Sequence, residues 1–365
     1  MQFLLCYIET QLVDHISSVS GGSFTSAYYG LHGDGLFENF ENEFLRFNLE
    51  KHLYRRAINP ALLFSGKGRT ESAIEYYQEI LFHDATFADM IQPDRPIIII
   101  NASDLGHGIR FSFIQEYFDL LCSDLSSFPV AQAVAASSAV PVLFDPVVLE
   151  NYDTCSDMQL TGTSRVRERI EAMDEGHIPV MLAQLDTYAD KDKRRYVHFV
   201  DGGITDNLGL RAIFDIIMVA GGMDEFVKRQ NKPASRHIVV VMVDAHTEPN
   251  TDMDQSIKQP STASVISSVS GLQLARYDAE SVRLVKHKMA QWAEQSTPEI
   301  PLKAHFISVR LPDIRQPDTL EFINKIPTSF NLNDEQVDRL IEAGRILLRD
   351  NPAFQQLLTD LANPL

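Results

Sequence analysis

Short apolar runs separated by helical patterns constrain the fold of this chain more than any other feature. Residues 97–100 are four consecutive isoleucines, and similar runs follow at residues 196–200, 238–243 and 306–309. Apolar runs of this length, rich in β-branched side chains, are typical of strands that are buried on both faces. One more strand is expected at residues 13–18, and helices are expected at residues 210–219 and 277–294. Strands that alternate with helices predict a three-layer α/β/α fold with a mostly parallel central sheet.

The length of the chain bears on its domain organisation. A chain of 365 residues is within reach of a single large α/β domain that carries insertions. We expect that domain at residues 1–330, with helical insertions at about residues 36–95 and 151–195. Residues 331–365 are expected to form a C-terminal helical extension, which packs on the same domain and is capped at its start by Asn333.

Phenylalanines recur at helical spacing in the first of these insertions. Phe37, Phe40, Phe44 and Phe47 are three or four residues apart, which places them on one face of a helix. An apolar helix stripe usually faces the core, so we expect these rings to be buried. The alternative is a lid whose aromatic face contacts lipid.

Composition excludes some classes of function. The formal net charge is −18, and an excess of acidic residues is unsuited to binding a nucleic-acid backbone. Cys6, Cys122 and Cys155 are far apart and lack a Cys-x-x-Cys pair, so neither a disulfide framework nor a zinc site is expected. The histidines also lack metal-ligand spacing. We find no signal peptide and no apolar run near the roughly 18 residues that span a membrane, which leaves a soluble or a membrane-peripheral protein.

Ser20 stands where a strand is expected to pass into a helix. The small residues two positions on either side, Ser18 and Gly22, permit the sharp turn of a nucleophile elbow, in a Ser-x-Ser-x-Gly version of its pattern. The turn would place Ser20 at the amino end of the following helix, where the helix dipole and the Gly21 amide favour a developing oxyanion. The same residues recur around Ser270, but no apolar strand precedes them, so a loop or a helix cap is expected there.

Asp201 directly follows the apolar run that ends at residue 200. The carboxyl ends of strands are where open α/β folds usually place their chemistry. Gly202 and Gly203 would let the backbone turn and leave the carboxylate accessible. The alternative interpretation is an ordinary turn from strand to helix, in which Asp206 or Asn207 caps the helix.

Four segments follow one another in an order that matches a known family. They are VDHISSVSGGS at residues 13–23, NASDL at 101–105, ASSAVP at 136–141 and FVDGGITDN at 199–207. Together they resemble the patatin-like phospholipase family, in its bacterial form, over most of the chain. The resemblance implies that Ser20 is the nucleophile and that Asp201 is the base that activates it. The other segments match structural turns around the site, and we assign them no catalytic role.

The resemblance also implies a function. It points to a serine lipid acyl hydrolase of the phospholipase A or esterase type, which cleaves fatty acyl esters through a Ser-Asp dyad and an acyl-enzyme. The implied substrate is a phospholipid or another acyl ester, no metal or organic cofactor is needed, and peripheral contact with a membrane is compatible with this substrate. The sequence leaves open the head group, the acyl position and the oligomeric state.

The sequence departs from the family pattern before Ser20. The family carries a glycine-rich loop that supplies oxyanion amides upstream of the elbow, whereas the 19 residues before Ser20 contain no glycine. We therefore expect either an N-terminally incomplete domain, which would be a poor catalyst until it is extended upstream, or a degenerate member of the family.

Two other functions remain open from the sequence. A Ser-His-Asp hydrolase would use Ser20, Asp201 and His246, in the chain order of the α/β-hydrolases, although a solvated loop histidine is the plainer interpretation of His246. A non-catalytic scaffold with the same fold would bind lipid or a partner without turnover.

Overall fold

Two compact units make up the chain. The computed structural model describes residues 13–47, 68–93, 95–141, 143–155, 177–229, 236–247, 254, 257–296 and 301–363. One unit is Ile8–Ala234, and the other is Ser235–Leu365 with a few N-terminal residues. The domain limits expected at residues 330 and 331 remain a prediction, as does the packing of the C-terminal extension on the α/β domain.

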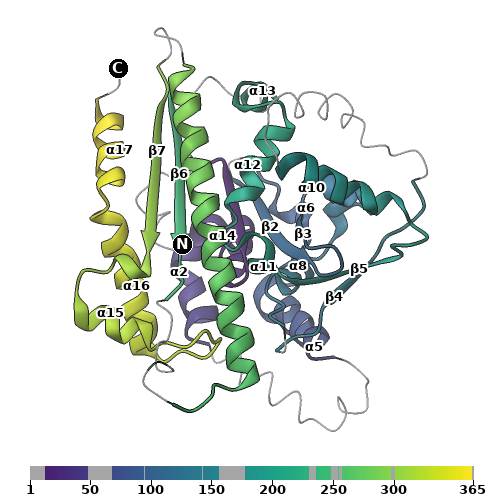
Figure 1. The fold of residues 1–365 in the computed structure, drawn as a ribbon, viewed down its shortest axis with the longest axis horizontal. Helices are drawn as coiled ribbons and strands as arrows, with labels where there is room; N and C mark the ends of the chain where they lie inside the picture. The colour runs from purple at the N-terminus through teal and green to yellow at the C-terminus, as the bar shows by residue number, and fades with distance from the viewer. Residues whose placement is uncertain are drawn as a thin grey trace. The chain divides into compact units, whose positions relative to one another are not determined.

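A five-stranded sheet organises the first unit (Figure 1). Its strands are β1 (His15–Val19), β2 (Ile97–Asp104), β3 (Ile109–Ser112), β4 (Val147–Glu150) and β5 (Tyr196–Asp201). Their order is β1-β2-β5-β4, and β3 pairs with β2 outside this path. β1 and β2 are parallel, in a register that pairs Val19 with Asn101. β3 and β5 are antiparallel to β2, and β4 is antiparallel to β5.

The α/β class is confirmed, but the sheet is mixed where the sequence predicts a mostly parallel one. β3 returns from β2 after only four residues, and so short a connection can join only antiparallel strands. β3 and β4 contain four residues each, which is too short to separate them from loops in the sequence. The strands expected at residues 13–18, 97–100 and 196–200 are confirmed as β1, β2 and β5.

Helices cover both faces of this sheet (Figure 1). The helices of the first unit are α1 (Gly21–His32), α2 (Leu36–Phe40), the π-helices η3 (Glu41–Leu45) and η4 (Tyr77–Phe82), α5 (Arg69–Tyr76), α6 (Phe87–Met90), α7 (Gln115–Leu120), α8 (Val130–Ser137), α10 (His177–Asp186), α11 (Gly203–Asp206), α12 (Leu210–Val219) and α13 (Met223–Arg229). Side chains of β1 alternate between the two faces: Ser18 accepts a hydrogen bond from Ser26 of α1, whereas Ser17 meets Gly209 at the start of α12. α1 and α12 therefore lie on opposite faces, and α8 packs beside α1 on β2 and β5.

Aromatic packing fixes the N-terminal helices of this unit. Phe40 is buried, and the Phe44 ring stacks on Phe24 with 4.7 Å between the ring centroids. The Phe47 ring stacks on Tyr76 of α5 at 5.9 Å. Apart from Phe40, the phenylalanines of the expected stripe are only partly buried, so the expected burial is confirmed for Phe40 alone. The packing of Phe44 and Phe47 on other aromatic rings of the same unit favours the core interpretation over a lid.

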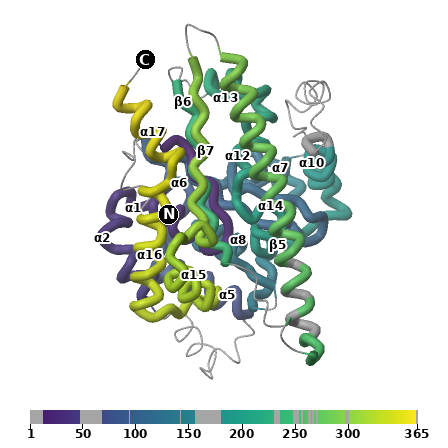
Figure 2. Tube along the Cα trace, turned by 60° about the vertical axis from the view of Figure 1, so that its left-hand side comes forward, coloured from purple at the N-terminus to yellow at the C-terminus, as the bar shows by residue number. Residues whose placement is uncertain are grey.

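A parallel strand pair with flanking helices forms the second unit (Figure 2). Its elements are β6 (His237–Asp244), α14 (Thr262–Glu294), β7 (Lys303–Arg310), α15 (Pro317–Asn324), α16 (Asp334–Arg349) and α17 (Pro352–Ala362). α14 packs along one side of the pair, and α16 and α17 pack along the other. The strands expected at residues 238–243 and 306–309 are confirmed, as is the Asn333 cap, whose Oδ1 accepts from the Gln336 amide at 2.9 Å. No helix among the described residues combines the length and the apolar content that crossing a bilayer requires.

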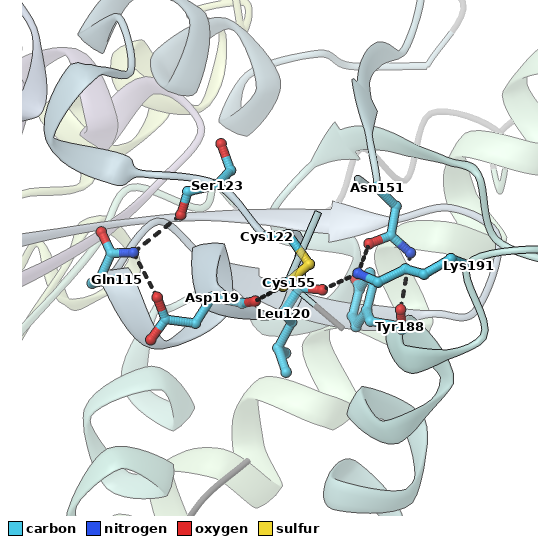
Figure 3. Close-up of a disulfide and its surroundings, with 9 residues drawn as sticks. All are labelled: Gln115, Asp119, Leu120, Cys122, Ser123, Asn151, Cys155, Tyr188 and Lys191. Atoms are coloured by element: carbon cyan, nitrogen blue, oxygen red, sulfur yellow. Dashed lines mark hydrogen bonds between the residues drawn. A yellow bond between two sulfur atoms is a disulfide. The ribbon is translucent and has the colours of Figure 1, made fainter. Parts of the chain in front are cut away.

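Cys122 and Cys155 form a disulfide, which corrects the expectation from the sequence that no cysteines pair (Figure 3). Their Cα atoms are 5.4 Å apart, although 33 residues separate them in the chain. The end of α7 lies beside the segment that follows β4, and Lys191 links the two by donating to the Leu120 carbonyl and to Asn151 Oδ1, both at 2.6 Å. Residue spacing does not reveal such a pair, because the approach depends on which segments the tertiary fold brings together.

Candidate active site

The turn between β1 and α1 holds Ser20 in a strained backbone conformation. β1 ends at Val19 and α1 begins at Gly21, so Ser20 is the single residue between strand and helix. Its φ of 52° and ψ of −130° lie in a region that residues with a side chain rarely adopt, at a cost of about 1–3 kcal/mol. Such a turn is what the elbow interpretation predicts, because the sharp change of direction lifts the serine side chain out of the sheet.

The carboxylate of Asp201 lies against the Ser20 hydroxyl. Ser20 Oγ donates to Asp201 Oδ2 over 2.6 Å, and the Gly203 amide donates to Asp201 Oδ1 over 2.8 Å. Asp201 is the last residue of β5, and only 8% of it is exposed. Burial raises the pKa of this carboxyl, and the hydrogen bonds from Ser20 and Gly203 oppose the rise without cancelling it. A hydroxyl and a carboxylate 181 residues apart in the chain therefore meet in the arrangement of a nucleophile and its base.

Close packing explains the two glycines after Asp201. A Cβ at Gly202 would lie 2.3 Å from the carbonyl oxygen of Asn101, and that oxygen belongs to the backbone of β2 and cannot move aside. A Cβ at Gly203 would lie 3.1 Å from Asp201 Oδ1. Gly202 therefore allows the start of α11 to approach β2. Neither glycine has a positive φ, so close packing, and not the turn that the sequence predicts, accounts for them.

The amino end of α1 supplies a place for negative charge. α1 begins with Gly21 and Gly22, and a Cβ at Gly21 would meet only open space. The first amides of a helix have no carbonyl partner within the helix, and the helix dipole favours an anion at this end. The site therefore combines a hydroxyl, a buried carboxylate and a helix terminus suited to a developing oxyanion.

Asn101 and Ser137 contact the elbow, although sequence reasoning assigns them no catalytic role. Asn101 Nδ2 donates to Ser17 Oγ at 2.9 Å and to the Ser18 carbonyl at 3.0 Å, which ties the end of β1 to β2. The Ser20 amide donates to Ser137 Oγ at 3.0 Å. Both residues belong to segments that resemble the family, NASDL and ASSAVP, and that position is the signal that points to them.

Asp206 serves the helix that follows it. Its Oδ2 accepts from the Ala212 amide in the first turn of α12 at 3.0 Å and lies 3.9 Å from Arg110 Nε. Burial raises the pKa of Asp206 to about 6, although the nearby Arg110 guanidinium acts to lower it. Asp206 therefore acts on the helix that follows it, as the alternative interpretation of this segment expects. That role does not exclude the contact of Asp201 with Ser20.

Alternatives to this site would use a histidine, the second serine segment or a metal ion. His246 is exposed after β6, in the second unit, so its part in a triad remains a prediction. Ser270 lies inside α14, so the loop or helix cap expected there is wrong, because the helix continues through this segment on both sides. Among the described residues, no three His, Cys, Asp or Glu side chains are grouped to hold a metal ion.

A comparison with family models places these residues in context. A model described as patatin-like phospholipase matches residues 7–214, which is more than half of the 365 residues. The matched region contains β1 to β5, both Ser20 and Asp201, and the first part of α12. A search of curated proteins found no match to the chain.

Proposed function

The chain belongs to the patatin-like phospholipase family, and on that premise we propose that it is a serine lipid acyl hydrolase in which Ser20 is the nucleophile and Asp201 its base. The family supports a lipid ester substrate in general. The observation that carries the assignment of residues is the 2.6 Å hydrogen bond from Ser20 Oγ to Asp201 Oδ2, at a strained turn. The proposed activity is of the phospholipase A or esterase type on fatty acyl esters, and membership of the family supports it.

The proposed reaction has two acyl-transfer steps. As Ser20 Oγ attacks the ester carbonyl, its proton passes to Asp201, and the carbonyl oxygen becomes an oxyanion. The tetrahedral intermediate expels the alcohol, which takes the proton from Asp201 and leaves an acyl-enzyme on Ser20. Water then attacks the acyl carbon and gives a proton to Asp201, and the fatty acid leaves as Ser20 takes this proton from Asp201. The Gly21 amide and the dipole of α1 stabilise the oxyanion in both steps.

The environment of Asp201 suits a carboxylate that acts as a base. An ordinary carboxylate holds a serine proton weakly, because its pKa lies far below that of a hydroxyl. Burial raises the pKa of Asp201 and so narrows this difference. The base must still be ionised to accept a proton, so the rate is expected to fall as the pH drops through this raised pKa.

Fatty acid release tests the proposal. The purified chain is incubated with a short-chain nitrophenyl ester and, separately, with phosphatidylcholine vesicles, and the parent is compared with Ser20→Ala. We expect the parent to release acid from at least one substrate and Ser20→Ala to lose that activity. Ser138→Ala is the control, because Ser138 is a buried serine near Ser20 whose hydroxyl donates to the Val134 carbonyl at 2.7 Å and not to Asp201.

The same vesicles separate the alternatives. A parent protein that sediments with vesicles and releases no fatty acid would indicate the scaffold function and contradict ours. Loss of hydrolysis in His246→Ala would instead indicate the histidine triad, whereas Asp201→Asn is expected to lose activity under either mechanism. Hydrolysis of the nitrophenyl ester alone would restrict the function to an esterase and argue against peripheral membrane contact.

A further inference from the structure

One short segment contacts the backbone of both proposed catalytic residues. α8 ends at Ser137, and the Ser137 hydroxyl accepts from the Ser20 amide at 3.0 Å. The carbonyl of Ser137 accepts from the Gly202 amide, and the carbonyl of Ala139 accepts from the Asp201 amide, both at 3.0 Å. Residues 137–139 therefore hold the strand end that carries Asp201 through their backbone, and the turn that carries Ser20 through one side chain.

The Ser137 hydroxyl has no freedom to rotate. Its oxygen donates to the Asn101 carbonyl at 2.6 Å, and a hydroxyl has only one proton to give. Ser23 Oγ lies 2.9 Å from Ser137 Oγ, so Ser23 must be the donor in that contact. The two lone pairs of Ser137 are therefore occupied by the amide of Ser20 and the hydroxyl of Ser23. All of the hydrogen-bonding capacity of Ser137 is used.

A chain of buried hydroxyls extends this arrangement under the elbow. Because Ser23 donates to Ser137, Ser18 is the only possible donor across its 3.2 Å contact with Ser23, and the Ile99 carbonyl at 3.5 Å is a second acceptor for the same proton. Ser26 donates to Ser18 at 2.6 Å. Ser18, Ser23, Ser26 and Ser137 are all buried. The Ser137 proton is directed at the Asn101 carbonyl, which leaves the Ser137 oxygen as an acceptor for the Ser20 amide.

We propose that Ser137 is a positioning residue, whose hydroxyl holds the Ser20 amide in the strained conformation that directs Ser20 Oγ at Asp201. This inference rests on the proposed function of Ser20. The Ser20 amide is committed to Ser137, so oxyanion stabilisation falls to Gly21 and the rest of the helix terminus. Without the Ser137 hydroxyl, the turn has one hydrogen bond fewer to offset its backbone strain, and Ser20 samples conformations that face away from Asp201.

Ser137→Ala and Ser138→Ala form a matched pair for the test. Both remove a hydroxyl from adjacent buried positions at the end of α8, but only Ser137 contacts Ser20. We expect kcat on the nitrophenyl ester to fall about tenfold in Ser137→Ala with KM unchanged, the loss associated with one buried hydrogen bond that positions a reacting group. The rate constant for labelling of Ser20 by a fluorophosphonate should fall by the same factor. Ser138→Ala should match the parent in all three measurements.

Amide exchange provides a readout that does not depend on activity or on the folding of a variant. In the parent, the Ser20 amide should exchange slowly and the Gly21 amide quickly, because only the former donates to a buried oxygen among the described residues. In Ser137→Ala, the Ser20 amide should exchange faster than in the parent. The melting temperature of this variant should stay close to that of Ser138→Ala. Fast exchange at Ser20 in the parent, or equal kcat in the two alanine variants, would overturn the proposal. If Ser20→Ala itself retains full activity, the proposed function fails instead, and slow exchange at Ser20 would still report the hydrogen bond to Ser137.

Discussion

The same six residues, Ile-Ser-Ser-Val-Ser-Gly, occur twice in this chain and adopt two different structures. Residues 16–21 form most of β1, the Ser20 turn and the first residue of α1, whereas residues 266–271 lie entirely within α14. In the first copy, Ile16 and Ser18 are buried in alternation with half-exposed neighbours, as in a strand. In the second, Val269 is 53% exposed on the surface of a helix.

The surroundings of each copy account for the difference. The first copy pairs along its length with β2, and Asn101 ties its end through two hydrogen bonds. Gly22 follows it and permits the sharp turn. Leu272 and other good helix formers follow the second copy, which has no such strand partner among the described residues. Tertiary pairing therefore overrides the local propensity of a segment, and a serine becomes a candidate nucleophile only where the fold places a base beside it.

The largest difference between the two copies is expected in the reactivity of their serines, Ser20 and Ser270, toward a covalent probe. A fluorophosphonate probe should label Ser20 and leave Ser270 unmodified, because Ser20 lies at a strained turn and donates to the buried carboxylate of Asp201, whereas Ser270 lies within a helix. Ser20→Ala should remove the label and lower ester hydrolysis by at least about 10³-fold, while Ser270→Ala should leave both unchanged. Peptide mapping of the labelled protein decides the matter. A label on Ser270 or Ser138 would contradict the assignment of Ser20.

The second largest effect is expected when Asp201, the proposed base beside the first copy, is replaced. Asp201→Asn keeps the size of the side chain but cannot accept the Ser20 proton, so hydrolysis should fall by about two decades or more. His246→Ala should stay within a few-fold of the parent. In the parent, the logarithm of the rate should decline toward acid through the raised pKa of Asp201. A pH–rate profile of the three proteins provides the measurement, and a severe loss in His246→Ala would favour the triad.

Glycine-to-alanine substitutions near the two copies should change the free energy of unfolding in opposite directions. Gly202→Ala forces a Cβ to within 2.3 Å of the Asn101 carbonyl, and overpacking of this kind costs about 1–3 kcal/mol in the free energy of unfolding. Gly271→Ala, in the second copy, adds a methyl group in open space within α14 and should stabilise the protein by about 0.5–1 kcal/mol. Thermal melts of both variants test the contrast. Similar melting temperatures would mean that the contact at Gly202 relaxes.

The third residue of each copy gives the smallest contrast. Ser18→Ala removes a buried hydroxyl, but Ser26 can turn to the Ser23 carbonyl at 3.2 Å, so the loss should be limited to about 1 kcal/mol. Ser268→Ala replaces a half-exposed helix residue with a better helix former and should stabilise by about 0.5 kcal/mol. Denaturant unfolding resolves differences of this size. Stabilisation in both variants would show that the Ser18 hydroxyl contributes nothing to the buried network.

The residues show what the sequence could and could not predict. Four isoleucines in a row make β2 evident, and a similar apolar run predicts β5. An apolar run does not indicate the direction of its strand, so the antiparallel pairing of β5 with β2 cannot be predicted from the sequence. The residues Ser20 and Asp201 were found through their motifs, and the structure adds the contact between them. The role of Ser137 could not be predicted, because it depends on hydrogen bonds between segments that only the tertiary fold brings together.

The buried Asp201 that the proposed activity needs is expected to lower the thermal stability of the protein at neutral pH. A pKa that is raised in the folded state means that folding favours the protonated carboxyl. The stability this gives is complete below the unfolded pKa, and it is lost as the pH rises through the folded pKa. At neutral pH, Asp201→Asn should therefore melt above the parent, and the two should converge in acid. Directed evolution that ranks variants by melting temperature alone would enrich neutral residues at position 201 and discard the proposed base, so a library of this protein needs a screen for turnover alongside heat resistance.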